Sequence, residues 1–239
     1  MLEVRHVSKS FRGLRAVHDA SFEVPEGSIN GLIGPNGAGK TTIFNVIAGV
    51  YAPDAGEILF AKKRIDGLRP DQVCAAGIGR TFQLVKPFAG LTVLDNVMVG
   101  AFLRERTAAS ARALSNSILK KLNLDAKAAL PASSLTLPDR KRLEVARALA
   151  TRPRLLLLDE VMAGLRPTEC DQMVEVFRDL NRREGLTILL IEHVMRAVMA
   201  LARHIGVLHH GEVIARGTPE QVVRDPAVLE CYLGEETPV

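Results

Sequence analysis

The stretch that decides the fold is Gly34-Pro35-Asn36-Gly37-Ala38-Gly39-Lys40-Thr41. It matches the pattern G-x-x-x-x-G-K-[ST] and stands between a short apolar run, 28–33, and a segment with helical spacing, 40–50. Glycines let backbone N–H groups curl around an anion, and the start of the following helix favours negative charge. A glycine-rich turn could match by chance, but the strand and helix around this one favour a nucleotide phosphate site.

Each residue type in this loop has an expected task. The Lys40 ammonium can reach the β- and γ-phosphates as a point charge, and the Thr41 hydroxyl can ligate Mg²⁺. We therefore expect ATP to contact the whole loop and the residue after it, that is Gly34, Pro35, Asn36, Gly37, Ala38, Gly39, Lys40, Thr41 and Thr42.

A second acidic motif follows the apolar run 155–158, which ends in Asp159 and Glu160. Such a run is typical of a parallel strand buried on both faces, and α/β sheets place ligands at the carboxyl ends of these strands. Asp159 would hold Mg²⁺, and Glu160 would polarise the attacking water. An acidic pair after a strand can also be a solvated turn, but the phosphate loop favours the catalytic interpretation.

The chain alternates strands and helices at its two ends and is helical between them. Period-2 patterns predict strands in the first 25 residues and near 56–60, and helical spacing appears at 93–103, 108–122 and 139–151. Further strands are predicted at 154–158, 186–191, 204–208 and 212–215, with helices at 168–183 and 194–201. We expect one domain over 1–239, with an α/β core from 1–83 and 153–239 and a helical subdomain over 84–152.

Composition excludes several other classes. The net charge is only +4, aromatic residues make up 4% and Trp is absent, so nucleic acid is not an expected partner. Cys74, Cys170 and Cys231 form no C-x-x-C pair, which argues against zinc and fits a reducing cytosol. The N-terminus lacks the apolar stretch of a signal peptide, and no apolar run approaches the roughly 20 residues of a membrane span. We therefore expect a soluble chain that meets a membrane only through partners.

Further motifs in the same order resemble the ABC ATPase family along the whole length of the chain. Gln83 in RTFQ is similar to the family's Q-loop, His193 in LLIEHVM to its switch histidine, 163–165 to its D-loop region, and Phe11 to its adenine-stacking aromatic. The resemblance implies a P-loop NTPase three-layer core with an antiparallel β subdomain and a helical subdomain. It also implies catalytic roles for Glu160, His193 and Gln83, and Mg²⁺ ligation by Thr41, Gln83 and Asp159.

Within the family, the chain is most similar to the branched-chain amino acid uptake type. The stretches that carry this likeness are GIGRTFQ, LTVLDNV, RLEVARALATRPRLLLLDE, IEHVM and RGTPEQV. The ATPase of lipopolysaccharide export and carriers of urea, amides or aromatic acids share much of the pattern and remain alternatives. The resemblance implies an ATP hydrolase at the cytoplasmic face of the membrane. Its implied partners are transmembrane permeases, a second ATPase (an identical copy or a paralogue) and, indirectly, an extracytoplasmic substrate-binding protein.

One motif departs from the family. The family signature reads Leu-Ser-Gly-Gly-Gln, whereas 135–139 reads Leu-Thr-Leu-Pro-Asp. The resemblance implies that each ATP is sandwiched between the phosphate loop of one subunit and the signature helix of the other. Thr136 keeps a hydroxyl for that ATP, but Pro138 has no N–H to donate, and Asp139 adds negative charge that would repel the γ-phosphate. The same letters suit a helix start, with Thr136 as N-cap and Asp139 as the N3 residue of a capping box. Lesser departures are Val161 for Pro and Arg166 for Asn or Asp.

Two other kinds of P-loop protein, a non-transport ABC protein and a small-molecule kinase, fit the sequence less well than a transporter subunit. ABC proteins of translation carry two cassettes, and those of DNA maintenance separate the two nucleotide motifs by a long coiled coil. This chain has one cassette, with Lys40 and Asp159 about 120 residues apart and no sustained heptads between them. A small-molecule P-loop kinase would not explain Gln83 and His193 together.

Overall fold

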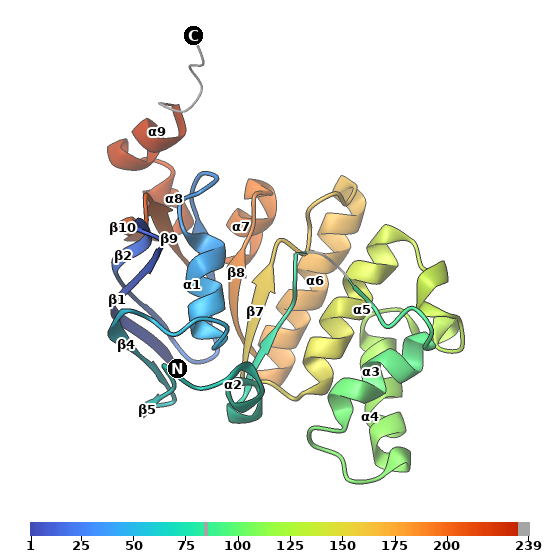
Figure 1. Cartoon of the computed structure of the whole chain (residues 1–239). Coiled ribbons are helices and arrows are strands. Elements are labelled where there is room, and N and C mark those ends of the chain that lie inside the picture. Colours follow the sequence, from blue (N-terminus) through green and yellow to red (C-terminus); the bar gives the residue numbers. More distant parts are fainter. Residues whose placement is uncertain (84–85, 234–239) are drawn as a thin grey trace.

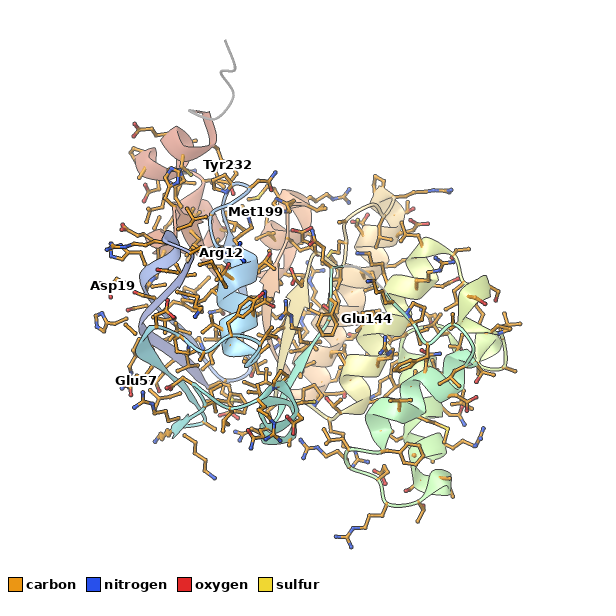
Figure 2. All side chains as sticks on the ribbon, in the orientation of Figure 1. Arg12, Asp19, Glu57, Glu144, Met199 and Tyr232 are labelled. Atoms are coloured by element: carbon orange, nitrogen blue, oxygen red, sulfur yellow. The ribbon has the colours of Figure 1, made fainter. Side chains whose placement is uncertain are left out.

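The computed structural model describes residues 1–83 and 86–233, which form two sheets and several helices in layers (Figure 1). The first sheet is antiparallel, with strand order β2-β1-β4-β5. Its strands are β1 (Leu2–Phe11), β2 (Leu14–Val24), β4 (Ala55–Phe60) and β5 (Lys63–Arg64). Asp19 and Glu57 point away from its outer side (Figure 2), while alternate residues such as Ile58 and Phe60 are buried beneath it.

The second sheet has six strands in the order β10-β9-β3-β8-β7-β6, all parallel except β10. They are β3 (Ile29–Ile33), β6 (Ile78–Arg80), β7 (Leu155–Asp159), β8 (Thr187–Ile191), β9 (His204–His209) and β10 (Glu212–Gly217). β3, β7 and β8 are buried along their whole length, as the continuous apolar runs of β7 and β8 predict. The carboxyl ends of β3, β8, β7 and β6 share one edge, where the loops that follow them come together.

Helices fill the space on both faces of this sheet. α1 (Lys40–Ile47) lies between the two sheets, whereas α6 (Pro167–Glu184) and α7 (Met195–Leu201) cover the opposite face (Figure 1). α3 (Val93–Ala101), α4 (Ala108–Lys121) and α5 (Leu137–Ala150) pack together on the side away from the antiparallel sheet, joined by the short 3₁₀ turns Asp125–Lys127 and Ala132–Ser134. These three helices were expected from their spacing. The division of the chain at 84 and 152 stays a prediction, and 84–85 lie outside the described residues.

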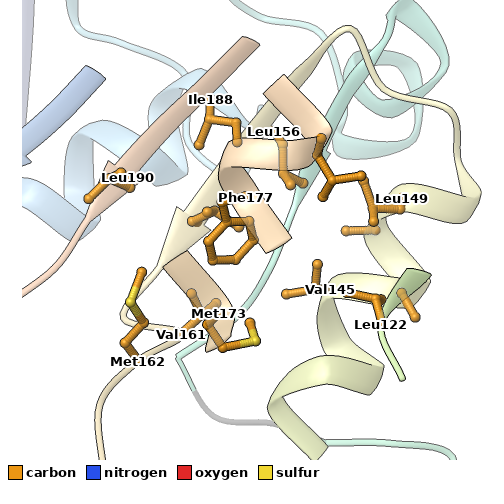
Figure 3. Close-up of a cluster of buried hydrophobic side chains, with 14 of the residues drawn as sticks. Leu122, Val145, Leu149, Leu156, Val161, Met162, Met173, Phe177, Ile188 and Leu190 are labelled. Carbon is orange, nitrogen blue, oxygen red and sulfur yellow. The ribbon is translucent and has the colours of Figure 1, made fainter. Parts of the chain in front are cut away.

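The period-2 alternation of the central strands divides the core in two. Leu156, Ile188 and Leu190 face the helices, where they surround Phe177 of α6 (Figure 3). Their neighbours Leu157 and Leu189 face α1 and the antiparallel sheet. The result is the three-layer arrangement expected from the sequence, with an antiparallel sheet on one side.

Besides β5 and the two 3₁₀ turns, four short elements were not predicted. They are α2 (Pro70–Ala76), β6, α8 (Pro219–Val222) and α9 (Pro226–Leu233). α2 begins at a proline and ends at Gly77 in the left-handed conformation, but so few residues hardly display a helical period. β6 is equally short, yet it matters because it pairs with β7 and so places Arg80 beside the carboxyl end of that strand. No helix within 1–83 or 86–233 is long and apolar enough to cross a bilayer.

Candidate functional site

The phosphate loop occupies residues 34–39, between β3 and α1, and Lys40, Thr41 and Thr42 form the first turn of α1. Gly34, Gly37 and Gly39 all have positive φ angles, of 148°, 78° and 102°. A Cβ atom on Gly34 would lie 2.0 Å from the Leu208 carbonyl oxygen, and one on Gly39 would lie 2.2 Å from that of Ala16. Conformation therefore favours glycine at all three positions, and space also requires it at Gly34 and Gly39, because β9 and β2 lie directly against the loop there.

Hydrogen bonds tie the loop to the turn after β9 and to its own lysine. Gly211, in the turn after β9, donates its N–H to the Ala38 carbonyl at 3.0 Å. The Lys40 Nζ is buried and donates to the carbonyl oxygens of Gly34 and Pro35, both at 2.7 Å. The first N–H groups of α1 have no partner within the helix and favour an anion. Loop and lysine together form a cradle that fits the phosphates of a nucleotide.

Three residues that the sequence places far apart meet at one carboxylate. Gln83 Nε2 donates to Glu160 Oε2 at 2.6 Å, and His193 Nε2 lies 3.0 Å from Glu160 Oε1. Each follows the end of a strand on the shared edge, namely β6, β7 and β8. The structure thus brings together the three predicted catalytic residues, beside the loop that follows β3.

Asp159 has a partner that sequence reasoning missed. Arg80 Nη2 donates to Asp159 Oδ2 at 2.9 Å, and Arg80 Nη1 donates to Asn45 Oδ1 at 2.6 Å. Asp159 itself is almost fully buried, and its Oδ1 has no hydrogen-bond partner among the described residues. Only the pairing of β6 with β7 shows that these two charges meet, so the motif GIGRTFQ could not reveal it.

The oxygen atoms at this edge suit a divalent cation. The buried Asp159 Oδ1 is an acceptor that still needs a partner, and the Thr41 hydroxyl and the Gln83 amide add neutral oxygens. Mg²⁺ prefers such oxygen ligands and usually completes its shell with water and substrate phosphates. The residues present therefore fit Mg²⁺ held together with a nucleotide.

Phe11 lies at the end of β1 and has an aromatic neighbour that was not predicted. Its ring meets that of Tyr51 edge to face, with centroids 5.0 Å apart, and Lys9 Nζ lies 5.7 Å from the Phe11 centroid. Both rings are partly exposed. Tyr51 follows α1 by only a few residues, so the pair lies near the helix that carries the phosphate loop.

Thr136 is the N-cap of α5, as predicted, but the predicted capping box is wrong. The Thr136 side chain accepts no bond from the N–H of Asp139; instead its hydroxyl donates to Asp139 Oδ2 at 2.9 Å. Lys127 also bonds to that carboxylate, and Arg142 lies 3.8 Å from it. Burial alone would raise the pKa of Asp139, but the hydrogen bonds from Lys127 and Thr136 outweigh it and lower that pKa.

Two consequences follow for the altered signature. The Asp139 side chain is buried and its charge is offset within its own chain, so the expected repulsion of a phosphate loses its basis. Among the described residues, no hydrogen bond joins Thr136 to the phosphate loop, so the structure does not bring it into the site formed by its own chain.

Comparisons with known proteins identify the family of the chain. Residues 17–163 match the family described as ABC transporter, and residues 212–237 match the family described as branched-chain amino acid ATP-binding cassette transporter. The chain is 39% identical to the high-affinity branched-chain amino acid transport ATP-binding protein LivG of Salmonella typhimurium and 38% identical to BraF of Pseudomonas aeruginosa, with 98% of each chain covered in both cases. It is 34% identical to the lipopolysaccharide export system ATP-binding protein LptB of Acidithiobacillus ferridurans, over 99% of this chain and 98% of that protein.

Solved structures are similar over nearly the whole chain. A nucleotide-free ATP-binding cassette from an ABC transporter has a TM-score of 0.89 at 30% identity, covering 97% of this chain and 98% of the other. A dimeric post-hydrolysis cassette bound to ADP and Pi has a TM-score of 0.84 at 24% identity, covering 92% and 99%, and supports the fold alone.

Proposed function

This chain belongs to the ATP-binding proteins of ABC transporters, in the branched-chain amino acid group, and from that premise we propose that it hydrolyses ATP to drive uptake of a branched-chain amino acid or a similar small polar solute. The observation that carries the proposal is the convergence of Gln83 and His193 on Glu160, beside a phosphate loop built for an anion. A carboxylate held by two polar side chains at that place suits the base of a hydrolysis reaction.

The chain's own groups would divide the work as follows. The N–H groups of the loop and of α1 bind the phosphates, and Lys40 exchanges its bonds to Gly34 and Pro35 for phosphate oxygens. Glu160 accepts the proton of the attacking water, with Gln83 and His193 fixing its orientation. Phe11, supported by Tyr51, offers a face to adenine. Thr41, Gln83 and Asp159 would hold Mg²⁺, which when bound neutralises charge on the phosphate oxygens.

Partners are proposed from two exposed features. A mainly apolar groove lies where α2, β6, α3 and α5 meet, lined among others by Val50, Pro70, Val73, Phe82 and Val99. Its lining residue Phe82 directly precedes Gln83 in the chain. We assign this groove to a transmembrane permease. The exposed start of α5 at Thr136 is assigned to a second cassette, identical or paralogous. The chain would then lie at the cytoplasmic face of the membrane and meet a substrate-binding protein only indirectly.

Lipopolysaccharide export is the second candidate function, favoured by the 34% identity to LptB. The match of residues 212–237 to the branched-chain amino acid family argues for amino-acid uptake instead. Branched-chain amino acid transport is also the process named for the relatives at 38–39% identity.

The test uses the chain assembled with its permeases in lipid vesicles. ATP hydrolysis should rise when a loaded leucine-binding protein is supplied, and labelled leucine should accumulate. Glu160→Gln should bind MgATP with unchanged affinity but turn it over more slowly, on the order of 10² to 10⁴, because an amide cannot act as a base. Turnover near that of the unmodified chain would show that Glu160 is not the base, and hydrolysis that ignores leucine would contradict the proposed cargo.

A further inference from the structure

The backbone at Glu160 has an unusual conformation. Its φ angle is +51°, in the left-handed region that residues other than glycine rarely adopt. Such a residue persists only where its surroundings fix it from several directions. The backbone of Glu160, the proposed base, must therefore be held by neighbouring groups.

Several hydrogen bonds hold the main chain of residues 160–162, and two of them come from buried ionisable side chains. Lys141 Nζ donates to the Glu160 carbonyl at 2.9 Å, and Glu192 Oε1 accepts the Met162 N–H at 2.8 Å. The Glu160 N–H itself donates to the carbonyl of Ile191 at 2.9 Å. The side chains of Val161 and Met162 are buried, and both lie near Met173 in the helix-facing core (Figure 3).

Lys141 and Glu192 are costly to keep in these positions. Lys141 is 5% exposed and Glu192 is 2% exposed, and the Glu192 Oε2 has no hydrogen-bond partner among the described residues. Burial raises the pKa of Glu192 to about 7 and lowers the pKa of Lys141. Lys141 makes no ion pair within 4 Å in the described part of the chain; its one described hydrogen bond goes to the Glu160 carbonyl. A buried charge used on a main-chain carbonyl points to a role in fixing that backbone.

The two side chains also come from elements that matter to the site. Glu192 directly precedes His193, which contacts the Glu160 carboxylate. Lys141 belongs to α5, one turn after the exposed helix start at Thr136. The same helix start packs on the turn after Met162, because a Cβ on Gly164 would lie 3.3 Å from Leu137 Cδ2. Any movement of α5 against the central sheet would therefore stretch the bond from Lys141 to Glu160.

We propose that Lys141 and Glu192 are positioning residues that clamp the main chain of 160–162, and that Lys141 makes the orientation of the Glu160 carboxylate depend on the position of α5. α5, whose start is assigned to contact with the second cassette, would thereby also set the orientation of Glu160 in its own chain. This inference rests on the proposed hydrolysis of ATP.

The first test compares Lys141→Met with Lys141→Arg in the assembled transporter. Met fills a similar space without a donor, and kcat should fall on the order of 10- to 100-fold, since small misplacement of a reacting group has effects of that size. MgATP affinity should stay within about 2-fold, because Lys141 touches no residue of the phosphate loop. Arg, which keeps a charged donor, should restore much of the rate. Lys121→Met is the matched control, since it removes a lysine that joins α4 to α6 through an ion pair with Glu184 at 2.6 Å and makes no bond to Glu160 in the described part of the chain.

A double variant separates positioning from general damage. If Lys141 acts through the Glu160 carboxylate, Lys141→Met should add little to the loss already caused by Glu160→Gln. A further loss of the full 10- to 100-fold in that background would overturn the proposal. For the other half of the clamp, Glu192→Gln keeps an acceptor for the Met162 N–H and should keep most of the rate, whereas Glu192→Leu should lower kcat; equal rates would remove Glu192 from the clamp.

A readout without hydrolysis keeps the two proposals distinguishable. In the nucleotide-free protein, amide hydrogen exchange over 160–165 should accelerate in Lys141→Met and stay unchanged in Lys121→Met and in β7. If the unmodified transporter hydrolyses no ATP, the proposed function fails, and this exchange still tests the clamp. Unchanged exchange over 160–165 in a folded Lys141→Met protein would overturn it. Should that variant not fold, Lys141→Gln takes its place, with the same expected direction.

Discussion

A single lysine stabilises the phosphate loop through hydrogen bonds within that loop. Lys40 Nζ bonds to two carbonyl oxygens of its own loop, at positions that a phosphate would compete for. Lys40→Ala should therefore weaken MgATP binding about 10- to 150-fold, which corresponds to the roughly 1.5–3 kcal/mol of a hydrogen bond to a charged group. A fluorescent ATP analogue would measure the affinity, and the melting temperature should stay close to that of the unmodified chain.

The matched control is Lys63→Ala, which removes an exposed lysine on β5. It should leave the affinity unchanged. Equal affinity in the Lys40 variant and in the unmodified chain would contradict the assignment of residues 34–41 to phosphate.

At this scale, sequence reasoning finds residues that carry their own chemistry and misses those that act through a neighbour. Glu160 and Lys40 stand in motifs that define their task. Arg80 depends on a strand pairing with β7, and Tyr51 depends on the end of β1 reaching the residues after α1. The capping box at Thr136 failed for the same reason, because Lys127 draws the Asp139 carboxylate away from the expected geometry.

The start of α5 is the element where this chain departs most from its family. Pro138 lies in the first turn of the helix, where N–H groups without helical partners would otherwise meet an anion. The Asp139 side chain is buried and paired within its own chain, so its charge no longer explains a weak ATP-bound dimer. The N–H group that Pro138 lacks remains as the physical reason. We expect ATP-driven dimerisation of the Glu160→Gln chain to be weak and to tighten about 10- to 150-fold in Pro138→Gly.

Light scattering with and without MgATP would measure this association. Pro70→Gly, in the first turn of α2, is the control that removes a first-turn proline elsewhere. Tight dimerisation with Pro138 unchanged would show that the altered signature is fully competent.

Among the elements, length and uniformity decided what could be predicted. β7 and β8 are unbroken apolar runs and were placed within a residue or two of their bounds. α2 and β6 are too short to display a period, and they follow directly on one another around Gly77. The sheet order is also beyond the sequence pattern, since it depends on which strands pair.

On the scale of the whole molecule, the groove at α2, β6, α3 and α5 joins the two regions of the chain. One wall, with Val73 and Phe82, is formed by α2 and the residues that follow β6. The other wall, with Val99, belongs to the packed helices. Glu144 is among the residues that line the groove, and its burial raises its pKa (labelled in Figure 2). A partner bound in this groove would contact both regions, so a shift of the helices against the core would change its contacts.

We therefore expect Val99→Asp to separate the chain from its permeases without harming nucleotide binding. Val99 is 48% exposed, so the substitution adds a charge to an apolar contact and little strain to the fold. A central interface residue typically contributes more than about 1 kcal/mol, so co-purification with the permeases should fall at least several-fold. Val223→Asp, at the end of α8 on the far side of the molecule (Figure 1), is the matched control, because Val223 is similarly exposed at 41%. MgATP affinity of the isolated Val99→Asp chain should equal that of the unmodified chain, since no group of the phosphate loop is touched. If the permeases co-purify equally well with both variants, the groove is not their docking site, and the coupling between helices and core must reach the membrane by another surface.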